Sequence, residues 1–156
     1  MSLGGGGGGQ GELQQLAQEI QALEEEIEAL EAEVEDMQDE KTNIDEAIEA
    51  VETLETGSTV QVPLGGGAYV RAEVQDIDEL VVELGGGYAA ERDQDGTIDT
   101  LEARKDTVDD RIEDLREEIS EIESESEQLE QQAQQMQQQA MQQQMQQMQG
   151  QPDEDE

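Results

Sequence analysis

An acidic stretch after the middle of the chain has ligand types and a spacing that could bind a metal ion. Its side chains fall at positions 1, 3, 5, 6, 8, 9 and 12 of a twelve-residue loop of the EF-hand type. Position 1 is Glu rather than Asp, no entering helix precedes it, and Asp-Gly before a helix is ordinary turn-and-cap chemistry. A calcium-responsive binder stays an open alternative, but we assign no metal ligands. The stretch comprises Glu91, Asp93, Asp95, Gly96, Ile98, Asp99 and Glu102.

The composition offers little for catalysis or cofactor binding. The 156 residues include no Cys and no His, so thiol nucleophiles, His general bases and the usual zinc ligands are absent. The glycine runs at 4–9, 65–67 and 85–87 lack the following Gly-Lys-Ser/Thr of a phosphate-binding loop. We therefore predict a protein that is not an enzyme, with no catalytic residues and no cofactor.

The net charge is extreme. With 43 acidic and 7 basic residues the chain carries a formal charge of −36, so we expect no nucleic acid partner, because phosphate contacts need Lys and Arg. Repulsion of this size is largely screened at about 1 M salt, where the Debye length is about 3 Å. We infer a halophile with a salt-rich cytoplasm. No stretch approaches the roughly 18 apolar residues of a membrane span, and no signal segment opens the chain. These features predict a cytoplasmic protein without a membrane partner.

Two long segments carry apolar residues at alternating spacings of 3 and 4, the a/d pattern of a coiled coil. The first predicts a helix over 12–55, within a segment 12–57 that Gly57 ends as a C-cap. The second predicts a helix over 95–149, with Asp95 or Thr97 as N-cap.

The two helices can be aligned antiparallel in a single register. Each a residue then faces a d residue, as in the pair Ile48 and Leu101. The same register places Lys41 opposite Val108 and Lys105 opposite Ile44. Lysines at such seam positions either fix the register of the two helices or simply extend their long side chains to nearby carboxylates.

Between the helices, residues 58–94 switch to alternation of period 2 and predict two β-hairpins that turn at the glycine runs. Pro63 cannot donate a ladder hydrogen bond, so it should lie at an edge or bulge. Short isolated hairpins are marginal and leave open edges, so we expect partner subunits to complete this base. The expected assembly residues are Val60, Val62, Leu64, Tyr69, Val70, Val74, Leu80, Val82, Leu84 and Tyr88.

The distal end of the paired helices is the candidate binding surface. Residues 131–149 carry no charge and consist of Gln, Met and Ala, and methionine forms adaptable apolar surfaces. The alternative is a frayed low-complexity tail without a binding role. We also expect a flexible leader at 1–11 and an acidic disordered tail at 150–156. The candidate binding residues at this end are Leu13, Leu16, Leu129, Met136, Met141, Met145 and Met148.

The sequence resembles the α-type subunit of archaeal prefoldin over roughly residues 12–130. The resemblance lies in Val60-Gln61-Val62-Pro63-Leu64-Gly65 with Ala68-Tyr69-Val70, and in Val81-Val82-Glu83-Leu84-Gly85 with Gly87-Tyr88, between two coiled-coil arms. Two hairpins rather than one indicate the α-type over the β-type. The glycine leader and the Gln/Met tail lie outside the family pattern.

This resemblance implies an α+β, mainly α fold: a long antiparallel two-helix coiled coil whose two basal hairpins join an oligomeric β-barrel. It also implies an ATP-independent chaperone that holds non-native proteins at its coiled-coil tips for a group II chaperonin. The implied assembly is a heterohexamer of two α-type and four β-type subunits. The alternative from another class is a structural coiled-coil tether or spacer that binds no client.

Overall fold

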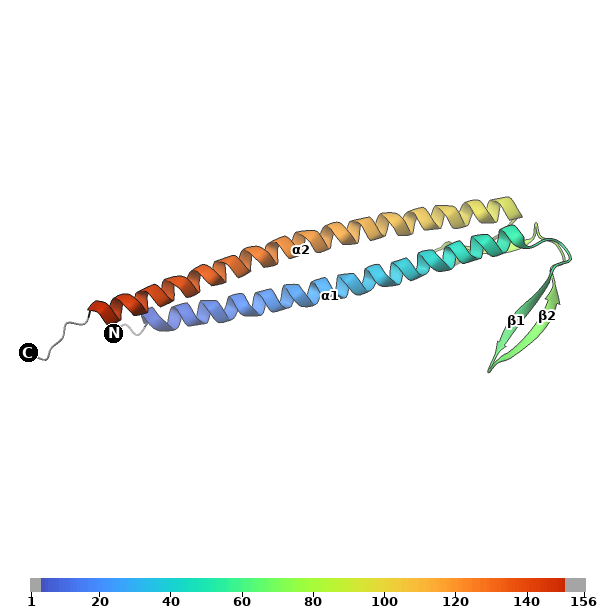
Figure 1. Ribbon diagram of the computed structural model, residues 1–156. Coiled ribbons are helices and arrows are strands. Elements are labelled where there is room, and N and C mark those ends of the chain that lie inside the picture. The colour runs from blue at the N-terminus through green and yellow to red at the C-terminus, as the bar shows by residue number, and fades with distance from the viewer. Residues whose placement is uncertain (1–3, 151–156) are drawn as a thin grey trace, which may run out of the picture. The chain divides into compact units, whose positions relative to one another are not determined.

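The structure, a computed structural model, describes the backbone of residues 4–150 and the side chains of residues 10–148. Its contacts divide the chain into two compact units, which we call the terminal unit (residues 1–34 and 115–156) and the hairpin unit (residues 35–114). The two long helices with two antiparallel hairpins between them confirm the predicted fold class (Figure 1). The elements are α1 (Gly4–Thr53), β1 (Thr59–Gly65), β2 (Ala68–Glu73), β3 (Leu80–Gly85), β4 (Tyr88–Arg92) and α2 (Gln94–Gly150).

Within the terminal unit, the segments of α1 and α2 pack along the predicted a/d seam. Leu16, Leu115 and Ile122 are buried there, and Leu115 is fully shielded from solvent. Burying a leucine side chain of this kind contributes about 1.5–3 kcal/mol to stability. Ser126 is buried at an a position of the same seam, so a small polar side chain interrupts the apolar layers.

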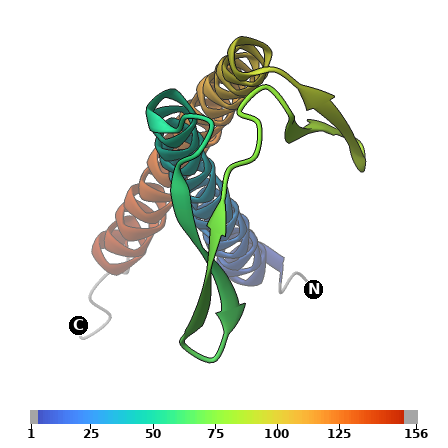
Figure 2. The same ribbon diagram turned by 90° about the vertical axis from the view of Figure 1, so that its right-hand side faces the viewer.

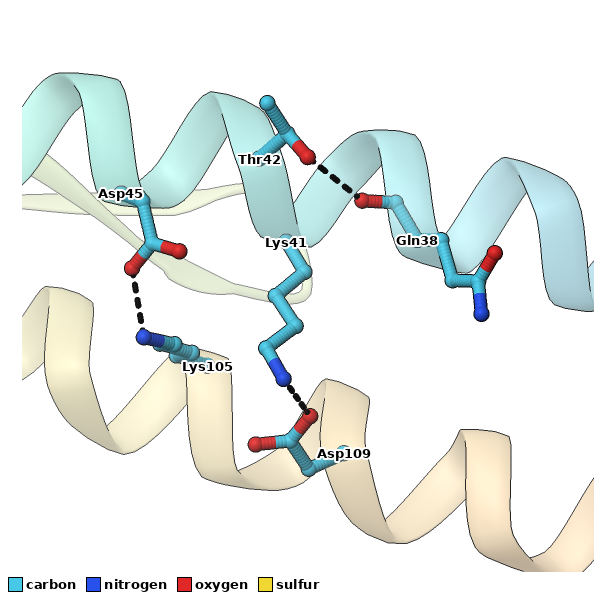
Figure 3. A network of polar contacts seen from close by, with 6 residues as sticks. All are labelled: Gln38, Lys41, Thr42, Asp45, Lys105 and Asp109. Carbon is cyan, nitrogen blue, oxygen red and sulfur yellow. Dashed lines mark hydrogen bonds and ion pairs between the residues drawn. The ribbon is translucent and has the colours of Figure 1, made fainter.

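Within the hairpin unit, two crossed ion pairs show how the residues of α1 are aligned with those of α2 (Figure 3). The ammonium of Lys41 lies 2.7 Å from Asp109, and that of Lys105 lies 2.6 Å from Asp45. Asp109 and Asp45 directly follow the two residues that the predicted register places opposite these lysines, so the register is confirmed in this unit. Both lysines extend out of the seam toward partly exposed carboxylates, as the snorkelling interpretation predicts. The seam itself buries Ile44, Leu101, Val108 and Ile112.

The start of α1 differs from the prediction. The helix begins at Gly4 rather than near Glu12 and so includes most of the segment expected to be a flexible leader. Glycine is disfavoured in a helix by about 1 kcal/mol relative to alanine, which is why the sequence predicted an irregular segment. A helix that is already nucleated gains one hydrogen bond for each residue added, and no proline interrupts it here. Residues 1–3, and 151–156 of the predicted acidic tail, lie outside the described residues.

Two predicted helix caps are wrong. α1 ends at Thr53, and Gly57 instead forms the turn into β1, with φ at 91° and its N–H donating to the Val74 carbonyl at 2.8 Å. α2 begins at Gln94, so neither Asp95 nor Thr97 is its N-cap. The cap is Asp93, whose Oδ1 accepts a hydrogen bond from the Gly96 N–H at 2.7 Å.

The strands form two separate two-stranded sheets, β1 with β2 and β3 with β4, as predicted (Figure 2). In the first hairpin Val62 pairs with Val70, and the register shifts between Pro63 and Gly65. Pro63 itself pairs with Tyr69 and directly precedes this irregularity, on a strand with one partner strand, so the prediction that it lies at an edge or bulge is confirmed. Within the described residues 4–150 each strand has one partner strand, so each hairpin leaves unpaired backbone along its outer edges.

Candidate binding surfaces

The β1–β2 hairpin exposes apolar side chains on both of its faces. Val62 and Val70 form a cross-strand pair on one face and are 41% and 46% exposed. Tyr69, which pairs with Pro63, points to the opposite face and is also exposed. An isolated two-stranded hairpin is marginal in water, and this one has no apolar cover over these side chains. Its chemistry suits burial against another β-sheet.

The β3–β4 hairpin has one protected position. Val82 is buried within the single chain at 7% exposure, whereas Val81, Leu84 and Tyr88 are exposed. Sequence reasoning did not include Val81 among the assembly residues, although it is 75% exposed. The sequence could have identified Val81, because Leu80-Val81-Val82 is a continuous apolar run, which is typical of a strand that is covered on both faces.

The predicted assembly residues therefore fall into three groups. Val82 is buried in the single chain, and the half-buried positions are Val60, Val74 and Leu80. The remaining six are exposed: Val62, Leu64, Tyr69, Val70, Leu84 and Tyr88.

The C-terminal end of α1 is tied to the start of α2 by Gln94. Its side-chain amide donates to the carbonyls of Val51 at 2.7 Å and Leu54 at 3.2 Å, which would otherwise lack a helical partner. The Gln94 N–H donates to Asp78 Oδ1 at 3.3 Å. Gln94 thus joins both helices to the loop between the hairpins, and nothing local in the sequence marks it for this role.

An apolar groove of about 420 Å³ lies beside this end of α1, against β1. Sequence reasoning missed it because it requires the start of β1 to lie beside the end of the helix. Its lining combines carboxylates with small and apolar side chains: Glu46, Glu49, Ala50, Thr53, Leu54 and Val60.

In the terminal unit, some candidate client-binding residues lie along the a/d seam and the others lie on the exposed surface of α2. Leu16 is buried, and Leu13, Leu129 and Met136 are half-buried along the a/d seam. Three methionines are exposed instead: Met141 at 67%, Met145 at 65% and Met148 at 81%. They follow an i, i+4, i+7 spacing and therefore share one face of α2, which we call the methionine stripe. Continuing the heptad places them at the outer b and f positions, away from the seam.

Charge is distributed very unequally along the chain. Residues 1–40 and 117–156 contain no Lys or Arg, while ion pairs join α1 and α2 within the hairpin unit. The hydrogen-bonded carboxylate of Asp45 raises the pKa of Lys105 above its usual value, and Asp109 and Asp106 act in the same direction. The methionine stripe lies in an uncharged stretch, so apolar contact there needs no desolvation of neighbouring charges.

The structure does not support a calcium loop at 91–102. Glu91 lies in β4, Asp93 caps α2, and the later residues already belong to that helix. Among the described residues, no three acidic, His or Cys side chains are grouped as metal ligands. None of the helices described here is long and apolar enough to cross a membrane.

A family model described as Prefoldin subunit matches residues 23–139. The chain belongs to the prefoldin subunit family. Prefoldin is a non-enzymatic chaperone family, in agreement with the prediction that the chain is not an enzyme. The matched region includes both hairpins and ends before the methionine stripe.

Similar proteins place the chain among α-type prefoldin subunits of halophilic archaea. The prefoldin subunit alpha of Halobacterium salinarum (strain ATCC 29341) is 70% identical over 105 residues, covering 67% of each chain. That of Haloarcula marismortui is 67% identical over 95 residues, which are 61% of this chain and 62% of the relative. The alignment thus spans slightly less than two thirds of that relative's length. The charge-based inference of a halophilic type agrees with these relatives.

A solved structure gives the same fold. A filamentous prefoldin from Methanocaldococcus jannaschii, determined by cryo-electron microscopy, matches with a TM-score of 0.64 and 25% identity. The match covers 72% of this chain and 96% of the other. Prefoldins form oligomeric complexes, which agrees with hairpins whose apolar faces are uncovered in the single chain.

Proposed function

We propose that this chain is one subunit of an ATP-independent chaperone that holds non-native proteins at its coiled-coil ends and passes them to a group II chaperonin. In this proposal two such subunits assemble with four β-type prefoldin subunits in the cytoplasm. The observation that carries it is the division of the exposed apolar side chains into two surfaces, one on the hairpins and one on the methionine stripe.

The hairpin surface supports assembly. Val62, Leu64, Val70 and Tyr69 are exposed on a two-stranded sheet whose outer edges are unpaired. Pairing of those edges with strands of a partner would satisfy backbone hydrogen bonds and bury the apolar side chains together. This fits completion by other subunits better than a role for the hairpins as an isolated cap.

The methionine stripe supports client holding. Each buried Å² of apolar surface contributes roughly 25 cal/mol, so one stripe binds an unfolded segment weakly. Several subunits in one complex would engage different segments of the same client and raise the overall affinity. Methionine side chains are flexible and polarisable, so they adapt to many client sequences.

The test is suppression of client aggregation by the assembled complex in molar KCl, followed by light scattering. Replacing Met141, Met145 and Met148 with Gln should lower protection while the mass of the complex stays unchanged. The matched control replaces Gln134, Gln138 and Gln142, also exposed on α2, with Ala and should protect like wild type. A deletion of 131–156 should reproduce the loss. A structural tether predicts no protection by any of these proteins, and that result would refute client holding.

Delivery needs a separate measurement. A labelled client bound to the complex should transfer to an added group II chaperonin and refold when ATP is supplied to the chaperonin. Retention of the client on this complex under those conditions would contradict the delivery step and leave the holding step intact.

A further inference from the structure

Sulfur is unevenly distributed over the surface of this chain. The sequence has six methionines and no cysteine. Met37 and Met136 are half-buried at the helix seam, whereas the three residues of the methionine stripe are 65–81% exposed. Met1 lies outside the described residues. An oxidant in solution therefore meets the thioethers of the stripe first, with no thiol in the chain to compete for it.

We propose that Met141, Met145 and Met148 form an oxidation-sensitive modification site, at which a hydroperoxide converts the client-holding stripe into a polar surface. The modification stands on exposure alone, and its consequence for clients rests on the proposed function. The oxidant is hydrogen peroxide or an organic hydroperoxide, and one equivalent is consumed for each methionine.

The chemistry balances without any other reactant. A lone pair of the thioether sulfur attacks the terminal peroxide oxygen, the S–O bond forms and the O–O bond breaks. Sulfur loses two electrons and the peroxide gains them, leaving as water or an alcohol after proton transfer from the terminal hydroxyl. The product, methionine sulfoxide, is polar and is restored by methionine sulfoxide reductases.

The surroundings make the stripe sensitive to this change. The described neighbours over 131–148 are Gln and Ala apart from Met136, so the three exposed thioethers supply most of the apolar surface there. A sulfoxide at an outer helix position remains solvated and leaves the seam residues untouched. Oxidation should therefore remove apolar binding surface without unfolding α2 or dissociating the complex.

The first measurement is the order of oxidation in the assembled wild-type complex. Limited peroxide treatment is followed by proteolysis and fragmentation mass spectrometry of the peptide that begins at Gln131, which separates Met136 from the stripe. Met141, Met145 and Met148 should gain oxygen well before Met136 and Met37. Equal rates at all five positions would overturn the modification site.

The second measurement is client protection before and after peroxide. Oxidised wild type should lose protection to the level of the Met-to-Gln variant, and sulfoxide reductase should restore it. The triple variant Met141→Leu, Met145→Leu and Met148→Leu keeps the apolar surface without thioethers, so it should protect with or without peroxide. Full protection by oxidised wild type would overturn this inference and leave the proposed function intact. Absence of protection by untreated wild type would overturn client holding itself and, with it, the consequence inferred for oxidation.

Discussion

The ammonium of Lys105 on α2 lies 2.6 Å from Oδ1 of Asp45 on α1, and this pair is one half of a crossed arrangement. The other half joins Lys41 to Asp109 at 2.7 Å, so each helix contributes one lysine and, four residues later, one aspartate. Shifting one helix along the other would break both pairs together. The arrangement therefore favours one register at the part of the seam where lysines replace apolar residues.

The stability of the folded chain should fall at alkaline pH as Lys105 loses its charge. Its pKa is raised in the folded state, chiefly by the hydrogen bond with Asp45, so its contribution is present below the ordinary lysine pKa of 10.5. That contribution is lost as pH rises through the folded-state pKa. Thermal unfolding in molar KCl should show wild type losing stability above about pH 10.5 more steeply than Lys105→Arg, because arginine keeps its charge there.

The comparison cancels the contributions of all groups that the two proteins share. Asp45→Asn should weaken the same pH dependence by removing its main cause, whereas Asp106→Asn should change it little. Identical pH profiles for wild type and Lys105→Arg would show that this ion pair does not contribute to folding.

The N-cap of α2 gives a second prediction with a control two residues away. Asp93 accepts the Gly96 N–H, so Asp93→Ala should lower the free energy of unfolding by about 0.5–2 kcal/mol. Asp95 lies inside the first turn, where its charge interacts favourably with the helix dipole, so Asp95→Ala should cost less, about 0.3–1 kcal/mol at low ionic strength. Chemical denaturation of both variants in the same salt measures the difference. A larger loss for Asp95→Ala would contradict the observed cap.

The long helices and the hairpins were predictable because their patterns repeat. Apolar spacings of 3 and 4 predicted both helices and their register, and glycine runs between alternating segments predicted the two hairpins. The cap of α2 was not predictable locally, since Asp93, Asp95 and Thr97 are all capping types. The residue that caps the helix is the one directly before Gln94, and Gln94 is held by tertiary hydrogen bonds to Val51, Leu54 and Asp78.

The candidate binding surface was predictable only in part. Composition pointed to the Gln/Met stretch, but it did not separate seam residues such as Leu16 from exposed ones such as Met145. Continuing the heptad letters into the uncharged stretch would have made that separation. The groove beside Val60 depends on the path of the chain after Thr53, which no periodic pattern specifies.

Folding should depend strongly on salt. Residues 1–40 and 117–156 carry many acidic side chains and no Lys or Arg, so repulsion opposes pairing of the helices. The Debye length falls from about 30 Å at 0.01 M to about 3 Å at 1 M salt, which screens that repulsion. Helical content by circular dichroism and the melting temperature should both rise over this range in KCl. Sucrose, which does not screen charge, should produce a smaller rise, and a melting temperature independent of KCl would refute the explanation.

Assembly through the hairpins can be tested at Val62. This side chain is 41% exposed in the single chain and pairs across the strands with Val70, so Val62→Asp places a charge on the apolar face without opening a core. Val82 is a poorer test because it is buried within its own chain, where a charge would also destabilise the subunit.

Val62→Asp should lower the native mass measured with the partner subunit in molar KCl, while helical content stays near that of wild type. Gln61→Asp, one residue away on the other face, is the matched control and should retain more of the assembly. An unchanged mass for Val62→Asp, or a monomeric wild type in the presence of its partner, would show that this face does not hold the subunits together.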